Sequence, residues 1–262
     1  MNLTDLSIII TSYNRKGIIS NAIDSVLMNC PNAEVIIVDD ASKDNTVQYL
    51  EKKYCHDIRN RKIKIFTLIK NIGVTGAKNY GFLASTRRFV GFLDSDDVLM
   101  RDSGRKMIKE FQLYQGALVY FFRCKDDKGK MVGEEIKKST KIDLKYFMNH
   151  TTKGEVFTVV DKSLYNCSPY FTLYRGYEGI GIATMLENGF GIISKEFVRI
   201  YDSSGEDRLS TGFGFNSRNK LLLLGHQLMY RRYRHLLTWN RKIMFLIKIF
   251  YMYLYKYFFQ FF

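Results

Sequence analysis

Ser7-Ile-Ile-Ile-Thr-Ser-Tyr-Asn14 decides the fold, because an uninterrupted apolar run ends there in a polar cluster. A strand that is apolar on both faces needs cover on both faces, as in a parallel sheet between two layers of helices. Apolar residues then recur at helical spacing from Ile18 to Leu27, which predicts the first covering helix. The stretch therefore predicts the start of an α/β fold.

The same alternation of short β-branched runs and amphipathic stretches continues to Arg123. It is typical of βαβ units on a mostly parallel sheet. Further strands are expected at 34–38, 63–68, 89–93 and 117–123, with helices up to residue 54 and at 76–85 and 100–114. Beyond them the pattern loosens and predicts strands at 156–160 and 190–200, a helix at 180–188 and a mobile Gly-rich loop at 202–218.

The composition is that of a chain that buries a core, with 46% hydrophobic and 25% charged residues in 262, which excludes disorder as the main state. The four cysteines lie far apart without a C-x-x-C pair, so a reducing compartment fits better than a disulfide framework or a zinc site. The N-terminal residues lack the basic segment and cleavage site of a secretory signal. We therefore expect a cytoplasmic protein.

The net charge of +14 is unevenly distributed. The last 43 residues contain no acidic residue and eight basic ones, namely Lys220, Arg231, Arg232, Arg234, Arg241, Lys242, Lys248 and Lys256. A basic chain attracts anions, and the candidates are nucleic acid, anionic lipid and phosphorylated small molecules.

Polar clusters follow four successive predicted strands, at 11–14, 39–40, 71–78 and 94–97. In open α/β sheets, ligands bind outside the carboxyl ends of the strands, so these clusters are expected to face one crevice. Helix capping is the alternative explanation for any one of them, since Asp, Asn, Ser and Thr are preferred before helices.

Asp94, Asp96 and Asp97 repel one another, and a divalent cation would relieve that repulsion. Such a cluster suits Mg²⁺ or Mn²⁺, which binds carboxylates together with phosphate oxygens and water. The segment 71–78 has the complementary character, with two glycines that permit close backbone approach, Thr75 as a helix cap and Lys78 in the first turn. Its spacing is neither a P-loop nor a dinucleotide fingerprint, which disfavours kinases, NTPases and NAD enzymes.

These motifs resemble family 2 glycosyltransferases of the GT-A fold. The resemblance is carried, in the family's order and spacing, by Ser7 to Asn14, Glu34 to Ser42, Asn71 to Gly81 and Phe92 to Asp97. It thins beyond residue 120 to Gly154-Glu155 and Gly176-Tyr-Glu178. It implies a Rossmann-like α/β/α sandwich with a mostly parallel central sheet, to which amphipathic C-terminal helices are added.

The resemblance also implies roles for site residues. Thr11 and Tyr13 would contact the nucleotide base, Asp39 would accept the N3–H of uracil, and Lys78 would contact phosphate in place of the family's frequent Arg. Asp94 would face ribose or a metal-bound water. Asp96 would bind the metal, with Asp97 as a close alternative.

Glu178 is the predicted catalytic base, which would take the proton from the attacking acceptor hydroxyl in an inverting transfer of the hexosyltransferase class. Gly179 stands where the family usually has Asp. Asp161 and Asp202 are less favoured as the base. A purely structural alternative is that Glu178 only caps the following helix or adds negative charge at its start. Loss of the Asp raises a second interpretation, a catalytically impaired membrane scaffold that binds nucleotide sugars.

The C-terminal segment from Ile243 to Phe262 contains ten aromatic residues in twenty. Its lysines interrupt it, and several basic residues from Arg231 to Lys256 fall close to one helical stripe, which favours a helix lying in an anionic membrane interface over one that spans. Packing on the catalytic domain or on a partner subunit is the alternative. Nucleic acid is disfavoured because no recognised binding motif accompanies the tail. His226 is interpreted as a polar helix residue rather than as a metal ligand.

Together these features predict a GT-A domain at 1–219, with a nucleotide-sugar half at 1–123 and an acceptor half at 124–219, followed by a membrane-associating tail at 220–262. The expected activity is metal-dependent transfer, with Mn²⁺ or Mg²⁺, from a UDP-sugar to a carbohydrate acceptor. The resemblance alone implies that the acceptor is lipid-linked and destined for a bacterial surface polysaccharide, and that the enzyme is peripheral on the inner face of the cell membrane.

Overall fold

The computed structural model describes residues 5–150, 154–174, 177–202 and 213–258. Its strands are β1 (Leu6–Ser12), β2 (Glu34–Asp39), β3 (Ile63–Thr67), β4 (Phe89–Asp94), β5 (Val98–Leu99), β6 (Val119–Asp126), β7 (Met131–Val132), β8 (Thr140–Ile142), β9 (Val156–Asp161) and β10 (Gly191–Tyr201). Its helices are α1 (Ile19–Asn29), α2 (Thr46–Lys53), α3 (Cys55–Arg59), α4 (Val74–Ala84), α5 (Ser103–Leu113), α6 (Leu144–Asn149), α7 (Gly179–Leu186), α8 (Phe213–Tyr233) and α9 (Trp239–Phe258), with a 3₁₀ turn at Thr172–Tyr174.

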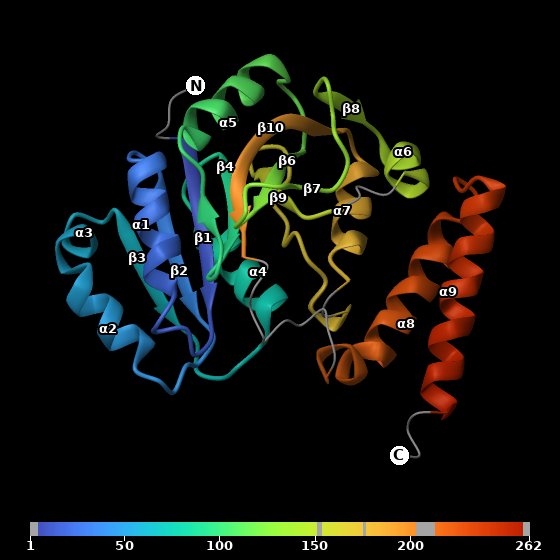
Figure 1. The fold of residues 1–262 in the computed structure, drawn as a ribbon, viewed down its shortest axis with the longest axis horizontal. Coiled ribbons are helices and arrows are strands. Elements are labelled where there is room, and N and C mark those ends of the chain that lie inside the picture. The colour runs from blue at the N-terminus through green and yellow to red at the C-terminus, as the bar shows by residue number, and fades with distance from the viewer. Residues whose placement is uncertain (1–4, 151–153, 175–176, 203–212, 259–262) are drawn as a thin grey trace.

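One mixed sheet forms the centre of the molecule, in the order β3-β2-β1-β4-β9-β6-β10-β5, with β7 on β6 and β8 on β10 (Figure 1). The predicted parallel pairing is confirmed for β3, β2, β1 and β4. Beyond β4 the sheet departs from the mostly parallel expectation, because β9 runs antiparallel to both β4 and β6. In the antiparallel pair of β4 and β9, Phe89 lies opposite Asp161.

Two layers of helices cover the sheet, as the apolar character of β1 predicts. Ile8 and Ile10 pack into the cluster that contains the buried residues of α1, α2 and α5. Ile9, with its side chain on the other face, belongs to the cluster of α4 and α7. Gly81 lets α4 approach closely, since a Cβ there would lie 2.6 Å from the Ile9 side chain.

The two C-terminal helices pack against α6 and α7 at the edge of the molecule (Figure 1). A third apolar cluster joins Met148 and Ile180 to Met229, Tyr233 and Phe245. Arg232 and Tyr233 also anchor α8, because both bind the carboxylate of Glu187, at 2.8 and 2.7 Å. One face of the tail is therefore buried, as the packing alternative expects.

Two expectations for this region need correction. The loop predicted at 202–218 lies outside the described residues at 203–212, but residues 213–218 already belong to α8. The basic residues also do not form one continuous stripe, because α8 ends at Tyr233 and α9 begins at Trp239. Within the described ranges, no helix has both the length and the apolar character needed to cross a bilayer.

Candidate active site

The carboxyl ends of three parallel strands bring the predicted nucleotide-binding residues to one edge of the sheet. Thr11 of β1 pairs in register with Asp94 of β4, and Ser12 pairs with Asp39 of β2. Thr11, Asp39 and Asp94 therefore lie at nearly the same level across adjacent strands, which are about 5 Å apart. The clusters that follow β1, β2 and β4 therefore lie side by side at this edge, as the sequence predicts.

Asp39 lies at the base of this edge, and its side chain is fully buried. Its two carboxylate oxygens accept hydrogen bonds from the backbone N–H and the hydroxyl of Ser42, at 2.8 and 2.5 Å. The Ser42 Oγ in turn accepts from the backbone N–H of Asn14, which joins the loops after β1 and β2. Tyr13 lies on that rim with 45% of its surface exposed, a position open to a stacking base.

Lys78 joins the neighbouring elements α4 and β4 to Tyr170 and Glu178, which lie about 90 to 100 positions further along the chain. Its buried ammonium is 3.1 Å from Asp94 Oδ1 and 3.3 Å from Glu178 Oε1, and it lies over the ring of Tyr170. Burial alone would lower the pKa of Lys78, but the two carboxylates raise it above its ordinary value. Burial likewise would raise the pKa of Asp94, and the charges of Lys78 and Arg199 bring it below its usual range.

The acidic cluster after β4 separates into an exposed and a buried carboxylate. Asp96 is exposed, whereas Asp97 is 1% exposed and forms an ion pair with Arg199 at 2.9 Å. Burial raises the pKa of Asp97 to about 7 and, with the Asp94 charge, also raises the pKa of Asp96. This geometry favours Asp96 over Asp97 for contact with a metal.

Arg199 of β10 is a site residue that the sequence reasoning missed. It is 2% exposed and contacts both Asp94 and Asp97, at 3.7 and 2.9 Å. The available signal is a lone Arg inside the apolar strand end Phe197-Val-Arg-Ile200. Asp40, which the sequence placed in the cluster at 39–40 without a role, accepts the backbone N–H groups of Ile72 and Gly73, both at 2.7 Å, and so holds the start of α4.

The residues at this edge fit a metal-bound diphosphate. The described part of the chain contains no group of three or more His, Cys, Asp or Glu side chains that could hold an ion. Asp94 and Asp96 could supply the one or two carboxylates that Mg²⁺ takes when phosphate and water complete its shell. Two buried hydroxyls, Ser12 Oγ and Thr75 Oγ1, have no hydrogen-bond partner among the described residues and can serve ligand oxygens.

The predicted capping role of Thr75 is wrong. Gly73, with a φ of 81°, occupies the N-cap position of α4, and Thr75 lies inside the first turn. A positive φ is readily adopted by glycine, which explains why the helix begins there.

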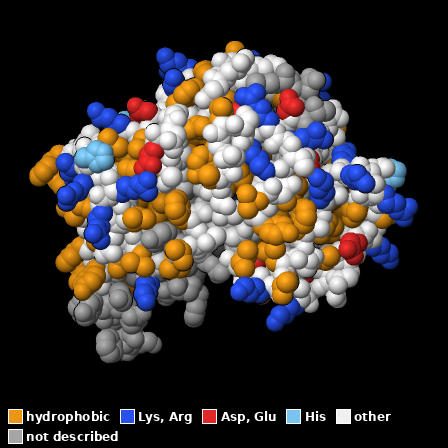
Figure 2. Space-filling view, turned by 180° about the vertical axis from the view of Figure 1, so that it is seen from behind, with side chains coloured by type: hydrophobic (Ala, Val, Ile, Leu, Met, Phe, Trp, Pro, Cys, Tyr) orange, Lys and Arg blue, Asp and Glu red, His pale blue; other side chains and the backbone are white. Residues whose placement is uncertain are grey.

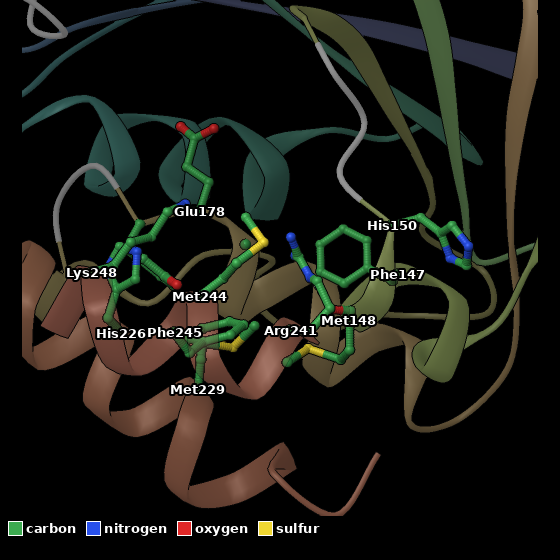
Figure 3. A pocket seen from close by; sticks show the side chains of 12 residues that line it. Phe147, Met148, His150, Glu178, His226, Met229, Arg241, Met244, Phe245 and Lys248 are labelled. Atoms are coloured by element: carbon green, nitrogen blue, oxygen red, sulfur yellow. The ribbon is translucent and has the colours of Figure 1, made fainter. Parts of the chain in front are cut away.

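Glu178 occupies the N-cap position of α7 but forms no capping hydrogen bond among the described residues. Its carboxylate points toward α4, where Lys78 lies (Figure 3). Gly176 of the same motif lies outside the described residues. The capping alternative therefore does not account for this side chain.

The two less favoured bases differ in position. Asp161 is fully buried, binds Arg88 at 2.8 Å and pairs with Phe89 at the opposite end of β4 from Asp94. Asp202 is near the acidic cluster, because its backbone N–H donates to Asp97 at 3.0 Å.

Two curated relatives cover most of the chain. One is the GalNAc(5)-diNAcBac-PP-undecaprenol beta-1,3-glucosyltransferase of Campylobacter jejuni, 28% identical over 81% of this chain and 69% of the relative. The other is the UDP-Glc:alpha-D-GlcNAc-diphosphoundecaprenol beta-1,3-glucosyltransferase WfgD of Escherichia coli, 26% identical over 74% of each chain. The putative teichuronic acid biosynthesis glycosyltransferase TuaG of Bacillus subtilis is 33% identical, but over only 44% of this chain and 45% of its own.

Solved structures confirm the predicted GT-A type of fold. The S. aureus TarS fragment 1–349 in complex with UDP-GlcNAc matches with a TM-score of 0.66 at 19% identity, over 86% of this chain and 66% of that one. The mannosyltransferase PcManGT from Pyrobaculum calidifontis, in complex with GDP-Man and Mn²⁺, matches with a TM-score of 0.60 at 12% identity, over 87% and 64%. This chain thus spans about two thirds of the solved chains that it resembles.

A family model described as Glycosyl transferase family 2 matches residues 7–175. That range includes the strand-end clusters and Lys78, and it ends just before Glu178. The chain belongs to glycosyltransferase family 2.

Proposed function

We propose that this chain is an inverting, metal-dependent glycosyltransferase that moves a sugar from a UDP-sugar to a lipid-linked carbohydrate acceptor. The observation that carries the proposal is the position of Lys78 between Asp94 and Glu178, within 3.3 Å of both. In the proposed mechanism, Lys78 would act as the cation for the leaving diphosphate, and the carboxylate that would accept the proton lies next to it.

Each residue then has a chemical task. Tyr13 stacks on the base and Asp39 accepts its N3–H, while Thr11 lines the same strand end. Lys78 stabilises the negative charge that develops on the diphosphate. Asp96, with Asp94 beside it, would hold a divalent cation, which would supply further neutralisation of the charge on the diphosphate. Glu178 accepts the proton of the acceptor hydroxyl.

The lipid-linked acceptor is supported by two relatives that are named for undecaprenol-linked substrates. The UDP-sugar donor is supported by the fold shared with a UDP-GlcNAc complex, and the divalent metal by the Mn²⁺ complex of a second neighbour. A role in surface polysaccharide synthesis on the inner face of the membrane, with residues 1–219 as catalytic domain and 220–262 as membrane-associating tail, completes the proposal.

A donor screen tests the function. The full chain is incubated with several UDP-sugars and Mn²⁺, without acceptor, and release of UDP is measured. Slow Mn²⁺-dependent hydrolysis of one donor, lost in Asp96→Ala, is the expected result. Failure of all donors, with UDP still bound, would favour the impaired scaffold that Gly179 suggests.

A further inference from the structure

A cavity of about 350 Å³ has Glu178 in its lining, and the Glu178 carboxylate points away from it toward α4 (Figure 3). It is formed where α6 and the start of α7 meet α8 and α9, so residues about 100 positions apart build it. Its lining consists of Phe147, Met148, His150, Tyr177, Glu178, Gly179, His226, Met229, Arg241, Met244, Phe245 and Lys248.

The cavity holds cations without matching carboxylates. Arg241 and Lys248 line it, and neither forms an ion pair with any described residue. Arg241 donates one hydrogen bond from Nε to the carbonyl of Met148, at 3.2 Å, which orients the guanidinium. Glu178, the acidic residue in the lining, pairs with Lys78 on the side of α4. The polar character of the cavity therefore suits an anion.

The rest of the wall is apolar and adaptable. Met148, Met229 and Phe245 are at least nine-tenths buried, while Met244 lies at the mouth with 44% of its surface exposed. Methionines adapt to irregular hydrocarbon because their side chains are flexible and polarisable. From Met244 the exposed residues Ile247, Tyr251 and Leu254 continue along α9 at helical spacing.

We propose that this cavity binds the diphosphate and first isoprenoid units of the acceptor, with Arg241 and Lys248 on the phosphates and the methionines and Phe245 on the hydrocarbon. The volume is at the lower end for ligand pockets, so it accommodates a headgroup and the start of a chain. The remaining chain leaves over the exposed face of α9. An acceptor held in this way presents its sugar at Glu178, opposite the donor. This inference rests on the proposed function for the identity of the ligand.

Farnesyl diphosphate is the probe, titrated calorimetrically into the full chain saturated with UDP and Mn²⁺, so that the proposed nucleotide site is occupied. Inorganic diphosphate and farnesol are titrated in parallel. We expect farnesyl diphosphate to bind at least about tenfold more tightly than either part alone, because both the cations and the apolar wall contribute. If inorganic diphosphate binds as tightly as farnesyl diphosphate, the cavity does not bind the isoprenoid chain and the proposal is wrong.

The variant Arg241→Gln/Lys248→Gln should weaken the binding of farnesyl diphosphate at least about tenfold and leave the affinity for UDP unchanged. A second variant keeps both cations: Met244→Glu adds a negative charge at the mouth of the cavity and should weaken binding of farnesyl diphosphate. The neighbouring Ile243 is 41% exposed and lies outside the lining, so Ile243→Glu is the control and should leave this binding unchanged. Unchanged probe affinity in Met244→Glu or in the double variant overturns the site.

The two failures are distinguishable. If UDP binds but the pocket variants have no effect, the pocket is wrong and the proposed function stands. If UDP does not bind while binding of farnesyl diphosphate still depends on Arg241, the cavity is a binding site as proposed and the proposed function is wrong.

Discussion

Glu178 and Lys78 form the contact on which transfer should depend. Glu178→Gln keeps the size of the side chain but removes the basic oxygen, so transfer should fall by about 10²-fold or more. The Kd for UDP with Mn²⁺ should stay within about twofold, because uracil and the diphosphate bind through other residues. Asp96→Ala should instead weaken UDP binding only when Mn²⁺ is present.

Initial rates and calorimetric UDP titrations measure the two effects. Glu135→Gln, an exposed carboxylate in a loop, is the matched control and should behave like the wild type. Full transfer activity in Glu178→Gln would remove this residue from the mechanism.

Arg199 and Asp97 form a buried ion pair whose loss should be costly. Arg199→Met leaves the Asp97 carboxylate without its closest cation, which typically destabilises a protein by about 3–5 kcal/mol. Arg199→Met/Asp97→Leu removes both charges and should recover most of that loss. Urea unfolding measures the free energy of unfolding of both variants. The control is Arg101→Met: the Arg101 side chain is 96% exposed, so this change should alter the free energy of unfolding by less than about 0.5 kcal/mol. A cost below about 1 kcal/mol for Arg199→Met would show that the pair is unimportant for stability.

The meeting of Thr11, Asp39 and Asp94 at one edge could be predicted, because each lies at the end of a strand whose apolar pattern is clear. Lys78 and Asp94 are 16 positions apart and share one crossover unit. Arg199 could not be predicted from spacing, because β10 reaches β6 through a connection of more than 60 residues and its register shifts between Ile193 and Arg199. Nothing local in the sequence fixes which side chain such an irregular strand presents.

At the scale of elements, Glu34 joins the amino ends of the parallel strands. Its carboxylate accepts hydrogen bonds from Ser7 and Lys64, both at 2.5 Å, and from Thr86. Burial opposes ionisation, but these bonds lower the pKa of Glu34 below its ordinary 4.5. Because the folded pKa is the lower one, the stabilisation is present above pH 4.5 and is lost as the pH falls through the folded value.

Glu34→Gln should therefore destabilise the fold by about 1–3 kcal/mol at pH 7, and its difference from the wild type should shrink below pH 4. Thermal unfolding between pH 7 and pH 3 checks this expectation. Glu51→Gln, an exposed side chain on α2, should follow the wild-type curve. A difference that stays constant with pH would rule out the ionised Glu34 as its cause.

Gly225 sets the distance between α8 and the segment that carries Glu178. A Cβ at this position would lie 2.7 Å from Cγ of Tyr177. Gly to Ala inside a helix usually stabilises by about 1 kcal/mol, but here the contact should displace Tyr177 and reverse the sign. We expect Gly225→Ala to lower both Tm and kcat while UDP affinity is unchanged. Gly17→Ala, with open space around the position, is the control, and a stabilised Gly225→Ala would contradict the contact.

Elements were predictable where periodicity is local, as in β1, α1 and α4. The C-terminal helices show the limit. Basic residues fall close to one stripe from Arg231 to Lys256 only if a single helix is assumed, and the turn after Tyr233 breaks that assumption. The break is fixed by tertiary contacts: Asn149 of α6 donates to the carbonyl of Leu236 and accepts the backbone N–H of Thr238.

At the scale of the whole molecule, Glu178 pairs with Lys78 on one side and lines the cavity on the other, and the exposed face of α9 continues from the cavity. Figure 2 shows hydrophobic side chains gathered with Lys and Arg on the side of the molecule where α8 and α9 lie. The exposed residues of α9 include Trp239, Ile247, Phe250 and Tyr251. A peripheral site on an anionic bilayer would bring a lipid-linked acceptor directly to the cavity.

This arrangement predicts membrane binding that depends on the outer face of α9. Ile247→Glu removes apolar surface and adds a negative charge that the anionic vesicle surface repels. Sedimentation of the full chain with phosphatidylglycerol vesicles should therefore fall about tenfold. Leu113→Glu on α5 is the matched control, because both side chains are 61% exposed, and it should sediment like the wild type. Raising salt from about 0.1 to 1 M shortens the screening length from about 10 to 3 Å and should weaken wild-type binding further, since the basic residues act through charge. Equal sedimentation of the two variants would show that α9 does not face the bilayer, and the exposed residues would then belong to another contact.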